Sequence, residues 1–304
     1  MFPILPANSA TTSFPGNDEG IFGFGSTAGG RVAITNLVSN TGVASSDVAG
    51  AAGVTVRSLL GACEYGGDKG IYGYGYMSGS QSMSNLVSNT GVVASDTTGV
   101  GSARTYITAC SYGEDKGIFG FGWNSPNMYN ETNLVSNAGV VSSDVTGVGS
   151  ARYGLNACEY GGDKGIFGFG YDRITQVSIT NLVSNTGVVA SDVTGVGTGK
   201  QGLAACTYGG DKGIFGYGVG GATKVSVTNL VSNAGVVSSD VTGVGTARNY
   251  PSATQYGQDK GIFGYGENGG KASMTNLVSN TGVVSSDVTG VGSGREGSAA
   301  CSFN

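Results

Sequence analysis

The residue types on which most enzyme chemistry depends are sparse in this chain, and histidine is absent. Without histidine, Ser-His-Asp catalysis, Cys-His catalysis and most zinc sites are excluded. Paired carboxylates can hydrolyse glycosidic bonds, but the acidic residues recur at equivalent places and no asymmetric acid pair stands out. We therefore expect a protein that is not an enzyme and that holds neither a cofactor nor a metal.

Five cysteines recur at one register of a repeated segment. Equivalent positions in neighbouring repeats do not usually reach the Cα separation of roughly 5.5 Å that a disulfide needs. No histidine and no C-x-x-C spacing supports a metal-binding thiol ring. We expect small buried core residues near the centre of the fold. They are Cys63, Cys110, Cys158, Cys206 and Cys301.

Two charged motifs also repeat. Asp-Lys pairs fall in predicted turns, where aspartate can accept turn amides and lysine stays solvated. Ser-Asp and a basic residue share one predicted connection, and we expect them to form structural ion pairs between repeats. The Asp-Lys pairs start at Asp68, Asp115, Asp163, Asp211 and Asp259. The Ser-Asp aspartates are Asp47, Asp96, Asp144, Asp192, Asp240 and Asp287. The basic residues are Arg57, Arg104, Arg152, Lys200, Arg248 and Arg295.

The elements that position these residues are six tandem repeats. Gly-Ile-aromatic-Gly-aromatic-Gly ends at Gly25, Gly75, Gly122, Gly170, Gly218 and Gly266. Intervals of 47 to 50 residues are typical of propellers or solenoids. Each repeat offers four short strands of β-branched and aromatic residues separated by Gly- and Asn-rich turns, and no window has a helical period. In the fourth repeat the predicted strands are 203–208, 212–218, 225–232 and 236–240.

The pattern predicts an all-β fold, a six-bladed β-propeller of four-stranded antiparallel blades, with residues 1–304 as one domain. A β-solenoid is the alternative. Glycine in the second strand would let an aromatic ring of the next blade lie close. The first strand occurs seven times, since Ser9–Phe14 and Arg295–Phe303 are both copies. We expect the carboxy-terminal copy to close the ring beside Gly20–Gly25. Residues 1–16 would then be displaced or exchanged with a neighbouring subunit, which favours a homo-oligomer.

Comparison of the six copies shows where they differ. The turns between strands 1 and 2 and between strands 3 and 4 barely change, whereas the segments after strand 2 and after the basic residue vary. In a four-stranded meander both variable segments emerge on one face, where aromatic and Met side chains would be exposed as a recognition surface. Neutral drift of unconstrained loops is the alternative. The candidate binding residues are Tyr76, Met77, Tyr106, Trp123, Asn127, Met128, Tyr129, Tyr153, Tyr171, Arg173 and Tyr250.

The order of elements resembles the kelch repeat: a basic residue, a strand of small residues, a turn, and an aromatic strand ending at a glycine-rich corner. It departs from that family in lacking a tryptophan after strand 4, since the one tryptophan is Trp123. The sequence Thr-Asn-Leu-Val-Ser-Asn-Thr-Gly-Val-Val also resembles kelch-like proteins predicted in environmental bacteriophage genomes. That resemblance implies a tail, fibre or other virion-surface component.

Charge and hydropathy bear on partners and location. A net charge of −5 gives no reason to expect nucleic acid or an anionic membrane as a partner, and no apolar run is long enough to span a bilayer. The amino terminus does not read as a secretory signal. We expect a virion-surface or extracellular protein that assembles with itself or with other virion proteins and presents the variable face to a receptor or cell-surface glycan. A soluble multivalent sugar-binding propeller is the main alternative, and a kelch-type oxidase or glycosidase is a third.

Overall fold

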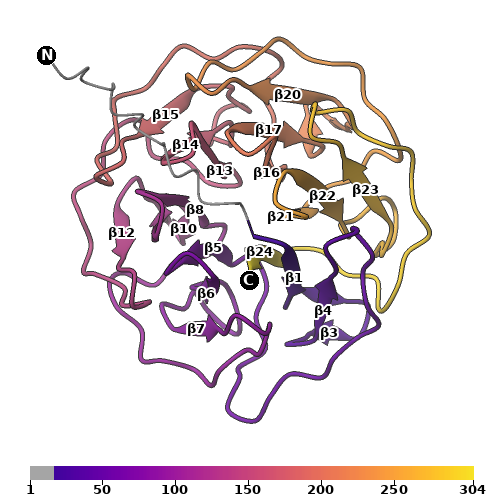
Figure 1. Ribbon diagram of the computed structural model, residues 1–304. Coiled ribbons are helices and arrows are strands. Elements are labelled where there is room, and N and C mark those ends of the chain that lie inside the picture. The colour runs from indigo at the N-terminus through magenta and orange to yellow at the C-terminus, as the bar shows by residue number, and fades with distance from the viewer. Residues whose placement is uncertain (1–16) are drawn as a thin grey trace, which may run out of the picture.

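The computed structural model describes residues 17–304, and this range is all β, with no helix. Six three-stranded antiparallel sheets, one per sequence repeat, lie around a common centre (Figure 1). The strand nearest the centre carries small residues and, in five sheets, a cysteine. The inner strands are β24 (Ala299–Phe303), β5 (Gly61–Tyr65), β8 (Thr108–Tyr112), β13 (Asn156–Tyr160), β16 (Ala204–Tyr208) and β21 (Ser252–Tyr256).

The middle strands carry the Gly-Ile-aromatic-Gly sequence and are buried on both faces. They are β1 (Glu19–Gly23), β6 (Lys69–Gly73), β9 (Lys116–Gly120), β14 (Lys164–Gly168), β17 (Lys212–Gly216) and β22 (Lys260–Gly264). The third strands contain the Asn-Leu-Val sequence. They are β4 (Thr35–Val38), β7 (Ser84–Val87), β12 (Thr132–Val135), β15 (Thr180–Val183), β20 (Thr228–Val231) and β23 (Thr275–Val278).

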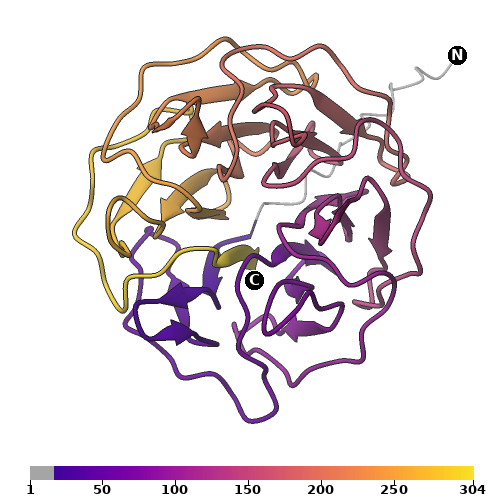
Figure 2. The same cartoon turned by 180° about the vertical axis from the view of Figure 1, so that it is seen from behind.

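Three small hairpins follow the middle strands of the first, third and fifth sheets. They are β2 (Ser26–Thr27) with β3 (Gly30–Arg31), β10 (Trp123–Asn124) with β11 (Asn127–Met128), and β18 (Val219–Gly220) with β19 (Thr223–Lys224). The long segments that connect one sheet to the next run along the periphery, which is clearest from behind (Figure 2).

The prediction of a fourth strand in each sheet is wrong. In the repeat of residues 203–240, residues 236–240 make only isolated bridges, with Val237 opposite Val231 and Val241 opposite Thr228. The hydroxyl of Ser238 accepts the Leu230 amide at 2.9 Å, and the Asn229 side chain donates to the Ser238 carbonyl. Side chains therefore replace part of the backbone ladder, so this outer segment follows the sheet without forming a strand.

Neighbouring sheets pack through interlocked aromatic rings. The ring of Phe169, just after β14, lies 5.2 Å from that of Phe215 on β17. Gly168 makes this approach possible, because a Cβ there would lie 2.8 Å from Phe215. The same combination recurs between every consecutive pair of sheets, including Tyr265 against Phe22. The predicted purpose of the strand glycines is thereby confirmed.

The two ends of the described chain meet in one sheet. β24 pairs antiparallel with β1, with Cys301 opposite Ile21 and Phe303 opposite Glu19. Each inner strand also contacts the inner strands of its two neighbouring sheets, and β24 contacts both β21 and β5. The pairing of the carboxy-terminal copy with the segment after Gly20 is thus as expected. The amino-terminal copy of this strand, residues 9–14, lies outside the described residues.

Candidate binding face

The two variable segments of each repeat lie side by side. The residue that follows each glycine corner forms an antiparallel bridge with the segment after a buried basic residue. Tyr76 pairs with Ser58, Trp123 with Thr105, and Tyr171 with Tyr153. The loops that differ most between copies therefore form one continuous surface.

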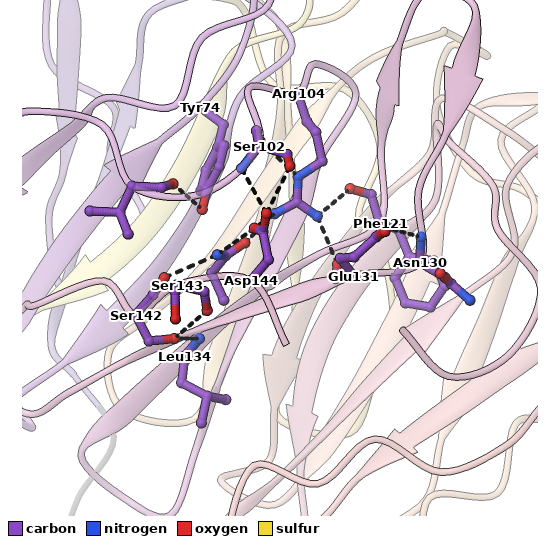
Figure 3. Close-up of polar contacts among 12 residues, drawn as sticks. Tyr74, Ser102, Arg104, Phe121, Asn130, Glu131, Leu134, Ser142, Ser143 and Asp144 are labelled. Atoms are coloured by element: carbon purple, nitrogen blue, oxygen red, sulfur yellow. Dashed lines mark hydrogen bonds and ion pairs between the residues drawn. The ribbon is translucent and has the colours of Figure 1, made fainter. Parts of the chain in front are cut away.

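A buried cation holds each pair of loops in place (Figure 3). The Arg104 guanidinium is fully buried and lies 5.1 Å over the ring of Tyr74 in the preceding sheet. It donates to the carbonyl oxygens of Glu131 and Phe121, at 2.7 and 3.2 Å, and to the side chain of Asn133. A buried guanidinium is tolerated because its donors are used and its face rests on an aromatic ring.

The repeated aspartate completes this network. Asp144 accepts the amide and hydroxyl of Ser102 at 2.9 and 2.7 Å, and it lies 3.8 Å from Arg104. Burial would raise the pKa of Asp144, but the hydrogen bonds from Asn133 and Ser102 outweigh it and hold the pKa below its ordinary value. The expected ion pairs between repeats are confirmed for the five arginines, and Arg104 pairs with the aspartate of the next connection. That aspartate lies beside Asn133 of the sheet that Arg104 precedes.

The same cation stack occurs in all six repeats. The cation lies 3.9 to 5.1 Å from an aromatic ring of the preceding sheet. The pairs are Arg57 with Phe24, Arg104 with Tyr74, Arg152 with Phe121, Lys200 with Phe169, Arg248 with Tyr217 and Arg295 with Tyr265. Burial lowers the pKa of Arg152 to about 10 and that of Lys200 to about 8, although the repeated aspartates oppose the shift. These residues are structural.

On this framework one half of the loop face carries a contiguous aromatic cluster. The ring of Tyr153 lies 5.2 Å from Trp123, 5.6 Å from Tyr171 and 5.3 Å from Tyr106. The Arg173 guanidinium lies 4.7 Å over Trp123. Five of the predicted residues, from two consecutive repeats, the third and the fourth, therefore come together. We call Tyr106, Trp123, Tyr153, Tyr171 and Arg173 the aromatic cluster.

Tyr250 reaches the cluster from the sixth repeat. Its ring lies 5.6 Å from that of Tyr106, and both backbones have positive φ, 47° and 53°. Burial raises the pKa of both tyrosines. The expectation that Tyr250 is exposed is wrong, and Tyr76, Trp123, Met128, Tyr129 and Tyr171 are likewise only partly exposed. Packing of the loops against one another covers much of each side chain.

The other predicted residues surround the cluster. Tyr76 lies beneath a different guanidinium, that of Arg31, at 4.5 Å. Met128 pairs with Trp123 across the β10–β11 hairpin. Tyr129 lies 5.9 Å from Arg104. Met77, beside Tyr76, and the exposed Asn127 complete the predicted set without joining the cluster.

The opposite half of the face has a different character that sequence reasoning missed. Lys224 pairs with Glu267 at 2.6 Å, and Lys271 pairs with Glu296. These ion pairs link equivalent loop positions of the fifth, sixth and first repeats. The sequence did hold a signal, since these variable segments carry charges where the second to fourth carry aromatic residues. The face is therefore asymmetric.

The cysteines border a small central cavity. All five are buried and unpaired, as expected, and burial raises their pKa values. The cavity, of about 50 Å³, is lined by all six inner strands and also by Glu64 and Glu159. Burial raises the pKa of Glu64 to about 6 and that of Glu159 to about 8. The expectation that no asymmetric acid pair exists is thus corrected, but the space holds only a few water molecules.

A second cavity of about 60 Å³, lined by small residues such as Ala109 and Ala205, lies between the same strands. Within residues 17–304 no group of three or more histidine, cysteine, aspartate or glutamate side chains could hold a metal ion. The sequence Asn130-Glu131-Thr132 is an N-glycosylation sequon. The side-chain amide of Asn130 donates to the Gly149 carbonyl at 2.6 Å. In the same range no helix is long and apolar enough to cross a membrane.

Comparison with known proteins adds no family assignment: no protein-family model matches the chain, and no curated protein matches it.

Proposed function

We propose that the chain is a closed six-bladed β-propeller acting as a non-enzymatic binding and structural module, with the variable loop face as its recognition surface. Contacts between successive inner strands support closure, because they continue from β24 to β5. Backbone hydrogen bonds between neighbouring turns also run through all six repeats, from Gly66 to Asp115 and finally from Asn304 to Asp68. The carboxy-terminal strand would then complete the first blade.

The aromatic cluster is the observation that carries the recognition role. Partly exposed aromatic rings and an exposed guanidinium, fixed on a rigid framework, are the groups that dominate binding energy at recognition surfaces. Neutral drift would give no reason for such residues to converge from two neighbouring repeats. The kelch-like resemblance and the absence of histidine fit the same proposal. The central cavity, which Glu64 and Glu159 line, is too small for a substrate.

We place this module on a virion surface or in another extracellular setting, assembled with copies of itself or with other virion proteins. Repeated exposed valines support assembly. One valine per repeat in the third-strand turns is 63 to 66% exposed, and further exposed valines follow in the peripheral segments. The turn valines are Val43, Val92, Val140, Val188, Val236 and Val283. An exposed apolar side chain repeated in every turn is suited to contacts with a like surface.

The alternative of a soluble multivalent lectin needs one similar site per repeat. Its loops would have to offer six similar pockets, whereas the aromatic half and the ion-paired half of the face differ. A single off-centre ligand site over the second to fourth repeats is therefore the better proposal. Binding stoichiometry separates the two: one ligand per chain is expected here, and about six for the alternative.

The recognition role is tested with a double variant, Trp123→Ala with Tyr171→Ala. Binding of the labelled protein to a saccharide array and to a panel of cells should fall at least ~10-fold. The matched control, Lys116→Ala with Lys164→Ala at the starts of β9 and β14 in the same two sheets, should bind as the parent does. If the aromatic variant binds like the control, the recognition face is wrongly placed. Light scattering and negative-stain imaging of the full chain test assembly. A strict monomer would contradict the proposed self-assembly.

A further inference from the structure

We propose that the ligand of the aromatic cluster is an acidic saccharide whose carboxylates pair with Arg173 and Arg31. This inference rests on the recognition role proposed above and names the chemistry of its ligand.

The first observation concerns which cations remain unpaired. Every lysine and arginine lies within residues 17–304, and twelve of the fifteen make an ion pair with a carboxylate. Lys200 makes none but is buried. In the part of the chain that the structure describes, Arg31 and Arg173 are therefore the two exposed cations without a carboxylate within 4 Å. Unpaired, exposed guanidiniums are free to bind an external carboxylate bidentately.

Their placement gives the second observation. Both guanidiniums are held flat on aromatic rings, Arg31 at 4.5 Å over Tyr76 and Arg173 at 4.7 Å over Trp123. The two rings follow equivalent glycine corners in adjacent repeats, and the two arginines approach them from the first and fourth repeats. Stacking fixes each guanidinium while its edge donors stay free for a carboxylate. Each of these two arginines thus presents an aromatic ring and a free guanidinium edge together.

The third observation concerns neutral polar groups. Asn124 and Asn127 face each other across the β10–β11 hairpin, beside Trp123. Neither side-chain amide makes a hydrogen bond to another described residue, whereas most buried framework amides do. A free amide offers two donors and an acceptor, which suits hydroxyl groups. Free amides, aromatic surface and free guanidiniums together suit a carboxylated polyhydroxy ring better than an apolar peptide.

Two anionic side chains lie next to this site, and one of them, Glu296, is paired with Lys271. Asp172 precedes Arg173, but its Oδ1 accepts the amides of Ile174 and Thr175 at 2.9 and 2.8 Å. The carboxylate thus organises the loop tip, where Arg173 has a positive φ of 76°. Ile174, which is 87% exposed, adds apolar surface at the same tip. The loop therefore presents the cation rather than neutralising it.

The test uses a short oligogalacturonate and the same oligomer with its carboxylates methyl-esterified, measured by calorimetry. The acid should bind, and the ester should bind at least ~10-fold more weakly, as loss of a charge-assisted hydrogen bond predicts. Arg173→Ala should weaken acid binding by a similar factor. Lys212→Ala, with the same charge change at the start of β17 and away from the variable loops, should not. Circular dichroism checks that each surface variant is folded.

Three outcomes overturn the inference. Equal binding of acid and ester is the first, and unchanged acid binding by both Arg173→Ala and Arg31→Ala is the second. The third is that oligogalacturonate, sialylated oligosaccharides and hyaluronan oligomers all fail to bind. If cell binding still depends on Trp123 and Tyr171 in those cases, the recognition face stands and only the acidic ligand is wrong. If cell binding does not depend on them either, the proposed function also fails.

Discussion

At the scale of the residue, six copies of one buried cation site act as an internal comparison. Five use arginine and one uses Lys200. Arg152 donates to the Phe169 and Ser150 carbonyls and to Asn181, at 2.8, 3.1 and 2.8 Å. Lys200 makes one side-chain hydrogen bond, to Asn229. The fully buried ammonium is thus less well satisfied than Arg152, although Arg248 and Arg295 also make one side-chain hydrogen bond each.

Lys200→Arg should therefore stabilise the protein. Each added hydrogen bond contributes about 1 kcal/mol, so a rise of roughly 2–4 °C in Tm is expected. The lowered pKa of Lys200, about 8, means that the unfolded chain binds the extra proton. Stability of the parent therefore rises as pH increases from about 8 towards the ordinary lysine value. The advantage of the variant should shrink over that range. A constant advantage in pH-dependent melting would contradict the assigned pKa.

Glu159 gives the opposite dependence on pH. Its pKa is raised to about 8 by burial, with repulsion from Glu64 adding to it. An unfolded chain releases this proton at lower pH, so folding stability falls as pH increases from about 4.5 to 8. Glu159→Gln should flatten this decline and stabilise the protein at pH 8 by roughly 1–3 kcal/mol. Urea denaturation at several pH values measures this, and a parallel decline in the variant would show that another group is responsible.

Much of the chemistry at this scale could be read from the sequence, and part could not. Burial of the cysteines followed from their place among small strand residues. The stacking of the basic residues on aromatic rings did not, because partners such as Arg152 and Phe121 lie in different repeats. The unpaired state of Arg31 and Arg173 was equally hidden, since it depends on which carboxylates the fold brings near.

At the scale of the element, glycine at the end of each middle strand sets the spacing between sheets. Gly168→Ala would place a Cβ 2.8 Å from the ring of Phe215, which is itself packed against Phe169. We expect a loss of about 2–4 kcal/mol in the free energy of unfolding. Gly270→Ala is the control, because its Cβ would meet nothing within 4 Å. Chemical denaturation should separate the two variants, and similar values would mean that the rings can move apart.

Strand type was predictable here because alternation and turn residues repeat six times. Strand number per sheet was not. The outer segments have the valine content of strands, yet Ser238 and Asn229 use side-chain bonds where a fourth strand would need backbone ones. The small hairpins were also missed. Their two-residue strands, such as Val219–Gly220, are too short to produce a pattern.

At the scale of the whole molecule, repetition in the sequence implies a repeating architecture but leaves its closure to the ends of the chain. The carboxy-terminal copy was a good candidate for closure, since Ala299–Phe303 matches the other inner strands in sequence. The asymmetry of the loop face needed the structure, because it depends on contacts such as that between Tyr106 and Tyr250, which lie three repeats apart.

Deletion of residues 299–304 tests closure directly. The deletion leaves β1 without its inner partner and removes Phe303, which is fully buried among Leu37, Val87 and their neighbours. It also removes the hydrogen bond from Asn304 to Asp68 and that from Asp18 to Asn304. If the molecule is one closed assembly, the loss cannot stay local, because each sheet is buried between two others. The truncated chain should melt at a much lower temperature or aggregate through the exposed edge of β1.

A synthetic peptide of residues 295–304 should restore part of the stability, and a peptide with Phe303 and Cys301 changed to serine should not. Unchanged cooperative melting of the truncated chain would show that the first sheet is dispensable and that the molecule is not closed.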